Sequence, residues 1–180
     1  MKYCSNCGTP VEYRIPEDDD RPRFVCDACH TIHYQNPKIV VGCIPEWEDK
    51  ILFCKRGIEP RKGMWTLPAG YLENHETLAE GAKRETQEEA DADVEILSPY
   101  AMFDLPFINQ IYLMFRARLT SDRFGPTPES SSVRLIAERD IPWNDLAFNV
   151  IRKTLALYLE DRVNGEYRFQ TGDISRHQVG

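Results

Sequence analysis

The residues of this sequence best suited to chemistry are three closely spaced glutamates, Glu85, Glu88 and Glu89. A helix predicted to begin at Thr77 and to run to about Ala90 would bring their carboxylates together, because residues three and four apart are neighbours on a helix. Like charges at that spacing repel by about 0.2–0.5 kcal/mol per pair. A hard divalent cation such as Mg²⁺ would reverse this penalty, because it takes carboxylate and phosphate oxygens as ligands. The alternative is a solvated acidic face, the usual explanation in a chain with 29 acidic residues.

The residues before the glutamates carry the start signals of that helix. Thr77 followed by Glu80 is a capping box, in which the hydroxyl and the carboxylate each accept from an otherwise unpaired backbone amide. Pro68 and Gly70 favour a turn over a continued strand. The sequence therefore predicts a loop that leads directly into the helix bearing the acids.

The other positions of this helix divide into a core face and a charged face. Gly81 costs about 1 kcal/mol relative to alanine in a helix, and we expect it to leave an opening beside the acids. Arg84 lies just outside the acidic cluster and is expected to orient one carboxylate through a bidentate pair. One arc of the helix is expected to face the core and consists of Leu78, Ala79, Ala82, Thr86 and Ala90.

A second chemical group is formed by two Cys-x-x-Cys pairs, Cys4 with Cys7 and Cys26 with Cys29. Their spacing is that of a zinc site. Four thiolates fill the tetrahedral coordination of Zn²⁺, so the site would be structural, with no open position for water. The metal would supply folding energy to a segment too short to bury a core. A redox-active pair and two disulfides are the alternatives. His30 and His33 are expected at the surface or at a hinge.

Composition limits the class of protein. A chain of 180 residues suggests one ordinary domain plus a small module, and 42% hydrophobic residues suffice for a core. The net charge of −7 disfavours non-specific binding to nucleic acid or to an anionic membrane. No apolar run is long enough for a membrane span, and the first ten residues have no signal-peptide core. We therefore expect a cytoplasmic protein whose cysteines are thiols and metal ligands.

A basic cluster precedes the acidic helix and consists of Lys55, Arg56, Arg61 and Lys62. A solvated loop is the simpler interpretation of each one, but together they are the positive charge nearest to the acids. We expect at least one of them to contact phosphate.

Hydrophobic runs and turn residues predict the remaining elements. Strands are expected at residues 39–44, 51–54, 94–97, 111–119 and 133–136, the first two as a hairpin. Ser98 and Pro99 should end the third strand, and a short aromatic segment should follow at 100–107. A long loop at 120–132, a helix at about 146–161 and a loosely held polar tail from Asn164 complete the chain. Cys43 and Cys54 need no role beyond packing in the core. The expected domains are 1–35, 36–163 and 164–180.

The spacing of Gly70, Glu76, Arg84-Glu85 and Glu88-Glu89 resembles the Nudix box, G-x5-E-x7-R-E-U-x-E-E-x-G-U. Asp91 stands where the box has its last glycine, and Thr86 and Ala92 are weak forms of its apolar positions. The resemblance covers roughly residues 37–162. It implies an α/β/α sandwich with a mixed sheet and the box as loop-helix-loop. The four-cysteine segment ahead of it resembles the zinc ribbon of NADH pyrophosphatases and of a group acting on FAD or ADP-ribose.

The reaction implied by this resemblance is hydrolysis of the pyrophosphate in a nucleoside diphosphate-linked compound, to give two monophosphates. Mg²⁺ or Mn²⁺ would be held by Glu85, Glu88 and Glu89 with the carbonyl of Gly70. The general base would be Glu88 or an acid of a later loop, for which Glu129 is the candidate. Arg84 and Glu76 would lock the loop to the helix.

The resemblance also bears on substrate and assembly. The motif that follows the box in NADH enzymes, Ser-Gln-Pro-Trp-Pro-Phe-Pro-x-Ser, is absent, which favours FAD or ADP-ribose over NADH. In the FAD and ADP-ribose group a late strand begins Glu-Val-Arg-Leu, whereas this chain has Ser132 in place of the glutamate. A homodimer is carried over from the family. The residues expected to contact the small-molecule nucleotide are Arg56 and Arg61 for phosphate. Trp65, Phe103 and Phe107 are the candidates for stacking on the base, and a place in the core is the alternative for each of them.

Two other functions compete with hydrolysis. Cys-x-x-Cys ribbons also bind nucleic acids, but such binding requires a basic surface, and the acidic run at residues 17–20 opposes it here. A non-catalytic nucleotide sensor on a Nudix scaffold is allowed by Asp91 and Ser132, but it is opposed by the intact Glu85, Glu88 and Glu89.

Overall fold

The structure is a computed structural model that describes residues 1–175. It divides into two compact units, residues 1–37 and a unit that begins at Lys38. The N-terminal unit contains a three-stranded antiparallel sheet made of β1 (Glu12–Arg14), β2 (Arg23–Val25) and β3 (Ile32–His33). The acidic run lies in the turn between β1 and β2, where Asp19 pairs with Arg23 at 3.1 Å.

The C-terminal unit is built on an eight-stranded mixed sheet with the order β10-β5-β4-β9-β8-β11, beside which β6 pairs with β5 and β7 pairs with β4. β4 with β9 and β8 with β11 are parallel pairs, whereas the other pairs are antiparallel. The strands are β4 (Lys38–Trp47), β5 (Lys50–Arg56), β6 (Trp65–Thr66), β7 (Ala69–Tyr71), β8 (Val94–Leu105), β9 (Gln110–Leu119), β10 (Ser130–Ala137) and β11 (Gln170–Asp173).

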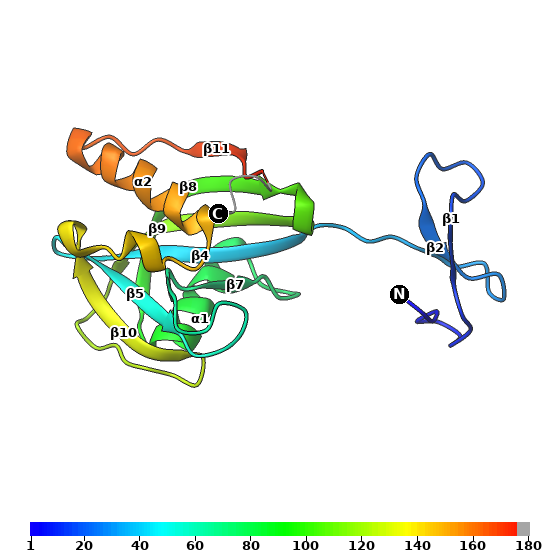
Figure 1. Cartoon of the computed structure of the whole chain (residues 1–180), viewed down its shortest axis with the longest axis horizontal. Coiled ribbons are helices and arrows are strands. Elements are labelled where there is room, and N and C mark those ends of the chain that lie inside the picture. The colour runs from blue at the N-terminus through cyan, green and yellow to red at the C-terminus, as the bar shows by residue number, and fades with distance from the viewer. Residues whose placement is uncertain (176–180) are drawn as a thin grey trace. The chain divides into compact units, whose positions relative to one another are not determined.

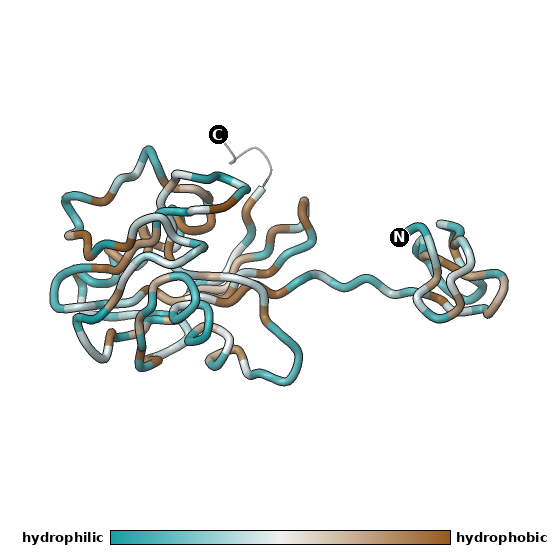
Figure 2. Tube along the Cα trace, turned by 90° about the horizontal axis from the view of Figure 1, so that it is seen from below, coloured by the Kyte–Doolittle hydropathy of each residue, from teal (hydrophilic) through white to brown (hydrophobic). Residues whose placement is uncertain are grey.

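Two helices cover the two faces of this sheet, α1 (Leu78–Ala90) and α2 (Asn149–Asn164), and Figure 1 shows the sheet between them. Successive residues of β5 point to opposite faces, so Phe53 packs in the core on the α2 side and Leu52 in the core on the α1 side. Hydrophobic segments recur along these strands, and hydrophilic ones form most of the outer turns (Figure 2). The predicted α/β/α sandwich with a mixed sheet is confirmed.

The predicted hairpin of the first two strands is only partly formed. β4 and β5 pair through Glu46 with Ile51 and Trp47 with Lys50, and β7 takes the position beside β4 at residues 40–42. This close pairing requires Gly42, because a Cβ there would collide with Ala69 and with the carbonyl oxygen of Pro68. The loop that carries Gly70 is thereby fastened to the centre of the sheet.

The prediction that Ser98 and Pro99 end a strand is wrong. β8 continues through them to Leu105, with register shifts between Ile96 and Ser98 and between Pro99 and Ala101. The shifts let the strand absorb a proline, which has no N–H to give to the ladder. Three short 3₁₀ helices follow the strands: η1 (Pro106–Ile108), η2 (Glu138–Asp140) and η3 (Trp143–Asp145).

The second helix lies three residues later than predicted. η3 ends at Asp145, and Leu146, the expected first residue of the helix, instead forms a bridge with Trp65, so α2 begins at Asn149. It ends at Asn164, where Gly165 takes the left-handed conformation with φ 71°. Glycine adopts this conformation without a Cβ penalty and commonly ends helices.

The prediction of a loose tail is wrong for residues 170–174; residues 176–180 lie outside the described part of the chain. Residues 170–173 form β11, parallel to β8, and Figure 1 shows the two strands side by side. Asp161 of α2 fastens the segment before β11, because its Oδ2 accepts from the Tyr100 hydroxyl at 2.9 Å and from Gln170 Nε2 at 3.2 Å. The Arg116 guanidinium lies 3.3 Å from the centre of the Tyr167 ring.

Candidate active site

Helix α1 starts and ends where the sequence predicts. The capping box is present: the Glu80 amide donates to Thr77 Oγ1 at 3.2 Å, and the Thr77 amide donates to Glu80 Oε2 at 2.8 Å. The helix ends at Asp91, which adopts the left-handed conformation with φ 48° and donates its amide to the Gln87 carbonyl at 2.9 Å. An aspartate thus performs the turn for which the box has a glycine.

The buried face of α1 differs from the predicted arc. Leu78 is 39% exposed, so its assignment to the core was wrong. Glu85 and Glu89 are 7% and 6% exposed and belong to the buried face. The buried residues of the helix are Gly81, Ala82, Glu85, Thr86, Glu89 and Ala90. Two of the three predicted catalytic carboxylates are therefore shielded from bulk water, and a solvated acidic face does not describe them.

Gly81 does not leave an opening, which corrects a second expectation. A Cβ at this position would lie 2.8 Å from Glu76 Oε1 and 2.9 Å from side-chain carbons of Leu72 and Val41. The glycine therefore allows the loop before α1 and strand β4 to approach the helix closely. This approach brings Glu76 within reach of Arg84.

Arg84 connects the loop to the acids of the helix. Its Nη2 and Nε donate to the two carboxylate oxygens of Glu76 at 2.7 and 3.0 Å, which is the bidentate geometry expected from the sequence. Its Nη1 donates to Glu85 Oε1 at 2.8 Å and to Glu88 Oε2 at 2.9 Å. Hydrogen bonds from Arg84 lower the pKa of Glu76 to about 2. One guanidinium thus holds three carboxylates.

Burial separates the three glutamates chemically. Desolvation raises the pKa of Glu89 to about 7, although its Oε2 accepts from the Ala69 amide at 3.1 Å. Desolvation also raises the pKa of Glu85. The Glu88 side chain is 49% exposed. The backbone of Gly70 lies against Glu85, since a Cβ on this glycine would overlap the Glu85 carboxylate. The site therefore combines buried carboxylates that favour protonation with one that faces solvent.

The donor set fits a hard divalent cation in its chemistry. A buried carboxylate is costly to ionise, and a nearby cation lowers that free-energy cost. Here Glu85 and Glu88 already share one cationic partner, the guanidinium of Arg84. Within residues 1–175, the cysteine group described below is the only set of possible ligands whose donor atoms all lie within 4.8 Å of one another. The three glutamates are thus not gathered at the spacing of a single ion.

A cleft of about 630 Å³ opens over these carboxylates. The predicted site residues that line it are Arg56, Arg61, Gly70, Arg84, Glu85, Glu88, Glu89 and Glu129. Arg56 is held in place by a bond from its Nε to the Pro60 carbonyl at 2.7 Å, and its guanidinium lies 5.2 Å from the centre of the Phe148 ring. The cleft therefore has an acidic wall on α1 and cations from the end of β5 and the loop after it, an arrangement suited to a phosphate ester.

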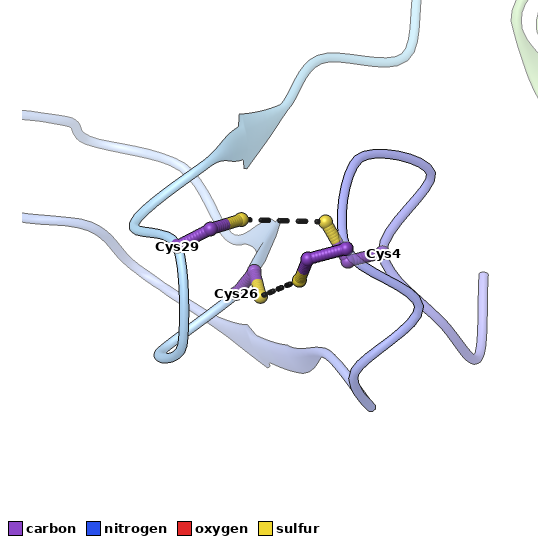
Figure 3. Close-up of side chains that lie close together, drawn as sticks. Cys4, Cys26 and Cys29 are labelled. Atoms are coloured by element: carbon purple, nitrogen blue, oxygen red, sulfur yellow. Dashed lines mark hydrogen bonds between the residues drawn. The ribbon is translucent and has the colours of Figure 1, made fainter.

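The four cysteines of the N-terminal unit meet at one point. Cys4 Sγ lies 3.6 Å from Cys29 Sγ, and Cys7 Sγ lies 3.4 Å from Cys26 Sγ. Figure 3 shows the sulfur atoms of Cys4, Cys26 and Cys29 turned toward one another. Sulfurs at the corners of a tetrahedron with Zn–S of about 2.3 Å are about 3.8 Å apart, so the cluster fits zinc. His33 Nε2 approaches Cys4 Sγ at 3.3 Å, closer than a surface or hinge position suggests.

Comparison with known proteins agrees with both units. Residues 36–158 match the NUDIX domain, and residues 2–35 match the zinc ribbon described as Nudix N-terminal. The chain belongs to the Nudix hydrolase family. A crystal structure of a NUDIX hydrolase from Nitrosomonas europaea is 57% identical in sequence, covers 97% of this chain and 99% of its own, and has a TM-score of 0.94.

Relatives with named activities are more distant. An ADP-ribose pyrophosphatase structure from Streptococcus suis is 25% identical, with a TM-score of 0.63 over 76% of this chain and 99% of its own. The NAD-capped RNA hydrolase NudC of Stutzerimonas stutzeri is 26% identical over 167 residues, which are 90% of this chain and 57% of that protein. The present chain therefore spans less than two thirds of the length of that relative. None of the helices in residues 1–175 is both long and apolar enough to cross a lipid bilayer.

Two residues predicted to contact a base lie elsewhere in this Nudix domain. Phe103 is fully buried in the core against α2, so it offers no surface to a ligand. Trp65 does not line the cleft; it lies between Lys55 and Arg134, whose cationic groups are 5.8 and 5.7 Å from its ring centre. Phe107, the third aromatic residue predicted, does line the cleft.

Sequence reasoning missed several residues of the cleft. Phe148 and Arg152 come from the start of α2, Tyr112 from β9 and Ile174 from the segment after β11. No spacing rule connects them to the Nudix box, because only the folded sheet brings them to it. Phe148 gave no local signal either, because the predicted helix of about 146–161 included it, whereas in the structure it directly precedes α2.

Proposed function

We propose that the protein is a divalent-metal-dependent pyrophosphatase that hydrolyses a nucleoside diphosphate-linked compound to two monophosphates, with FAD or ADP-ribose favoured over NADH. The observation that carries the proposal is the cleft of about 630 Å³ whose wall holds the buried Glu85 and Glu89 beside Glu88 and Arg84. The similarity to the ADP-ribose pyrophosphatase from Streptococcus suis supports this choice.

The carboxylates of Glu85, Glu88 and Glu89 and the carbonyl of Gly70 would together hold one to three Mg²⁺ or Mn²⁺ ions, and the glutamates would have to move closer to share any one ion. Such an ion, when bound, offsets phosphate charge and activates water. Arg56 and Arg61 bind the negative phosphate oxygens from the other side of the cleft. Arg84 keeps Glu85 and Glu88 oriented while its bond to Glu76 fixes its own position.

The reaction conserves atoms in a simple way. The oxygen of water bonds to one phosphorus, the bridging P–O bond breaks, and the bridging oxygen leaves on the other phosphate. For FAD the products are AMP and FMN, and for ADP-ribose they are AMP and ribose 5-phosphate. A proton is taken from the attacking water by Glu88 or by Glu129. Both acids line the cleft and are partly or fully exposed, so either can pass this proton to solvent.

The test is Mg²⁺-dependent release of AMP from FAD, ADP-ribose and NADH, and of nicotinamide mononucleotide from NAD-capped RNA. Glu88→Gln and Glu89→Gln should each reduce turnover at least about a hundredfold, because each removes a charged ligand. Glu95→Gln is the matched control, since Glu95 is an exposed acid of β8 that does not line the cleft. Turnover that persists in both cleft variants would refute the assignment of the site.

A zinc ribbon also suits the proposal as a structural module. We propose that Cys4, Cys7, Cys26 and Cys29 hold Zn²⁺ in a closed site, because four thiolates leave no position for a substrate. The ribbon would then contribute folding stability to residues 1–37 and no chemistry.

A further inference from the structure

Strand β11 places an apolar side chain in the wall of the cleft. The strand runs parallel to β8 with Gln170 opposite Ala101 and Asp173 opposite Asp104. The next residue, Ile174, continues the ladder by donating its amide to the Asp104 carbonyl at 2.9 Å. Ile174 is 2% exposed and lines the cleft. The match to the NUDIX domain ends at residue 158, so this segment lies outside the matched residues and yet contributes to the cleft.

Ile174 is part of a continuous apolar stretch of that wall. Leu105, the last residue of β8, is 5% exposed and packs in the same core cluster. Phe107 and Ile108 of η1 follow it and also line the cleft, but they are 38% and 46% exposed. Such exposure of large apolar side chains at the mouth of a cleft costs solvation free energy, which a bound apolar group would recover.

The sheet order separates this stretch from the charged part of the cleft. Arg56 ends β5 and Gly70 pairs beside β4, whereas Leu105 ends β8 and Ile174 follows β11. In the order β5-β4-β9-β8-β11, three strand intervals lie between β4 and β11. At about 4.8 Å per interval this is about 14 Å.

The position of β11 is fixed from α2. Asp161 accepts from Gln170 at the start of the strand, and Lys153 Nζ donates to the Asp173 carbonyl at 3.2 Å at its end. Both anchors lie outside the cleft. The strand is therefore held at each end, and its last residue is kept against Leu105.

We propose that residues 170–174 are a substrate-selecting element: Ile174, with Leu105, Phe107 and Ile108, forms the subsite for the planar ring of the substrate. The Phe107 ring would stack on this ring, and Ile174 would form the floor beneath it. Stacking of a base on an aromatic side chain contributes about 1–3 kcal/mol. The proposal rests on the proposed function, because it assigns the ring-binding end of the same cleft.

Equilibrium binding separates this proposal from the question of catalysis. The ligands are AMP and FMN, which carry different rings, and ribose 5-phosphate, which carries a phosphate and no aromatic ring. We expect Phe107→Ala and Ile174→Ala to weaken the binding of AMP, FMN or both about tenfold, which is 1.4 kcal/mol. The ligand that loses affinity identifies the ring. Ribose 5-phosphate should bind equally to all variants.

The control variant is Val163→Ala, which truncates a 79%-exposed apolar side chain of α2 that does not line the cleft. Because Ile174 is buried, its variant is checked by thermal unfolding; Phe107 is exposed, so its variant tests the subsite even if Ile174→Ala unfolds. Unchanged affinities for AMP and FMN in Phe107→Ala, or no binding of either to the unmodified protein, would overturn the proposal. If Phe107→Ala and Ile174→Ala weaken nucleotide binding as expected but Glu88→Gln keeps full activity, the proposed function is refuted and the ring subsite is not.

Discussion

The guanidinium of Arg84 donates hydrogen bonds to both carboxylate oxygens of Glu76, at 2.7 and 3.0 Å. These bonds connect the loop before α1 to the helix that carries the acids. The same side chain bonds Glu85 and Glu88. Removal of the bond between Glu76 and Arg84 should therefore change the position of the Glu85 and Glu88 carboxylates, although Glu76 itself does not line the cleft.

Glu76→Gln tests this connection. The amide keeps the shape of the carboxylate but loses the charge, so Arg84 is no longer fixed and turns more toward Glu85 and Glu88. We expect a 10- to 100-fold loss of Mn²⁺ affinity or turnover, about the effect of removing a residue that orients metal ligands. Metal titration and steady-state kinetics measure it. Glu95→Gln removes an exposed acid 3.9 Å from Arg118 and should change neither; equal effects of the two variants would contradict the role of Glu76.

Glu89 predicts how stability depends on pH when the cleft holds no divalent ion. Its pKa rises from 4.5 to about 7 because of burial, so the folded state binds a proton that the unfolded state has lost. That contribution is complete below pH 4.5 and disappears as the pH rises through 7. The free energy of unfolding should fall by about 3 kcal/mol between pH 4.5 and 8 on this account. Urea unfolding of zinc-loaded protein without Mg²⁺ or Mn²⁺ measures it.

Glu89→Gln is the matched variant for that measurement. Glutamine cannot ionise, so most of the decline should vanish, and the residual slope reports Glu85, whose pKa is raised in the same direction. Addition of Mn²⁺ at pH 8 should stabilise the unmodified protein more than the variant. An unchanged pH dependence in Glu89→Gln would show that this carboxylate is ionised in the folded protein throughout the range.

Local signals predicted the helix that carries the candidate site. Thr77 and Glu80 start the helix by contacts within one turn, and the box spacing fixes which residues share its surface. Both depend only on neighbours in sequence, which is why the prediction, a helix from Thr77 to about Ala90, lies within a residue or so of the observed α1. The burial of Glu85 and Glu89 was not predicted, because it depends on β7 and on the sheet beneath the helix.

Elements fixed by distant partners were predicted poorly. The sequence Gln-Thr-Gly-Asp of β11 has no hydrophobic pattern, and it becomes a strand only because β8 offers a free edge about seventy residues earlier in the chain. The prediction ended this strand at Pro99, because the rule that proline ends a strand takes no account of the register shifts that accommodate it. The same limit explains why Phe103 was assigned to a ligand: its exposure depends on α2, which covers it.

The cysteine cluster predicts a stability effect confined to one unit. Cys29→Ser removes a thiolate ligand, so zinc should be lost and residues 1–37 should become sensitive to proteases. The unit beginning at Lys38 has its own core and should unfold at nearly the same temperature. Zinc content, limited proteolysis and calorimetry measure these effects. Cys43→Ala, at a buried thiol of the larger unit, should retain zinc; loss of zinc from this control would mean that Cys43 takes part in binding.

Asp91 offers a stabilising substitution at the end of the catalytic helix. Its φ of 48° places a Cβ-bearing residue in the left-handed region, which favours glycine. Asp91→Gly should raise the free energy of unfolding by about 0.5–1 kcal/mol, whereas Asp91→Ala should lower it by a similar amount. Part of the gain is offset, because Gln87 Nε2 loses its bond to Asp91 Oδ1 at 3.0 Å. Gln87→Ala removes that exposed bond alone and so measures its contribution to the free energy of unfolding.

Turnover should be unaffected by either substitution of Asp91, since Asp91 does not line the cleft. A glycine variant less stable than the alanine variant would mean that the aspartate side chain, and not the backbone conformation, determines how this helix ends.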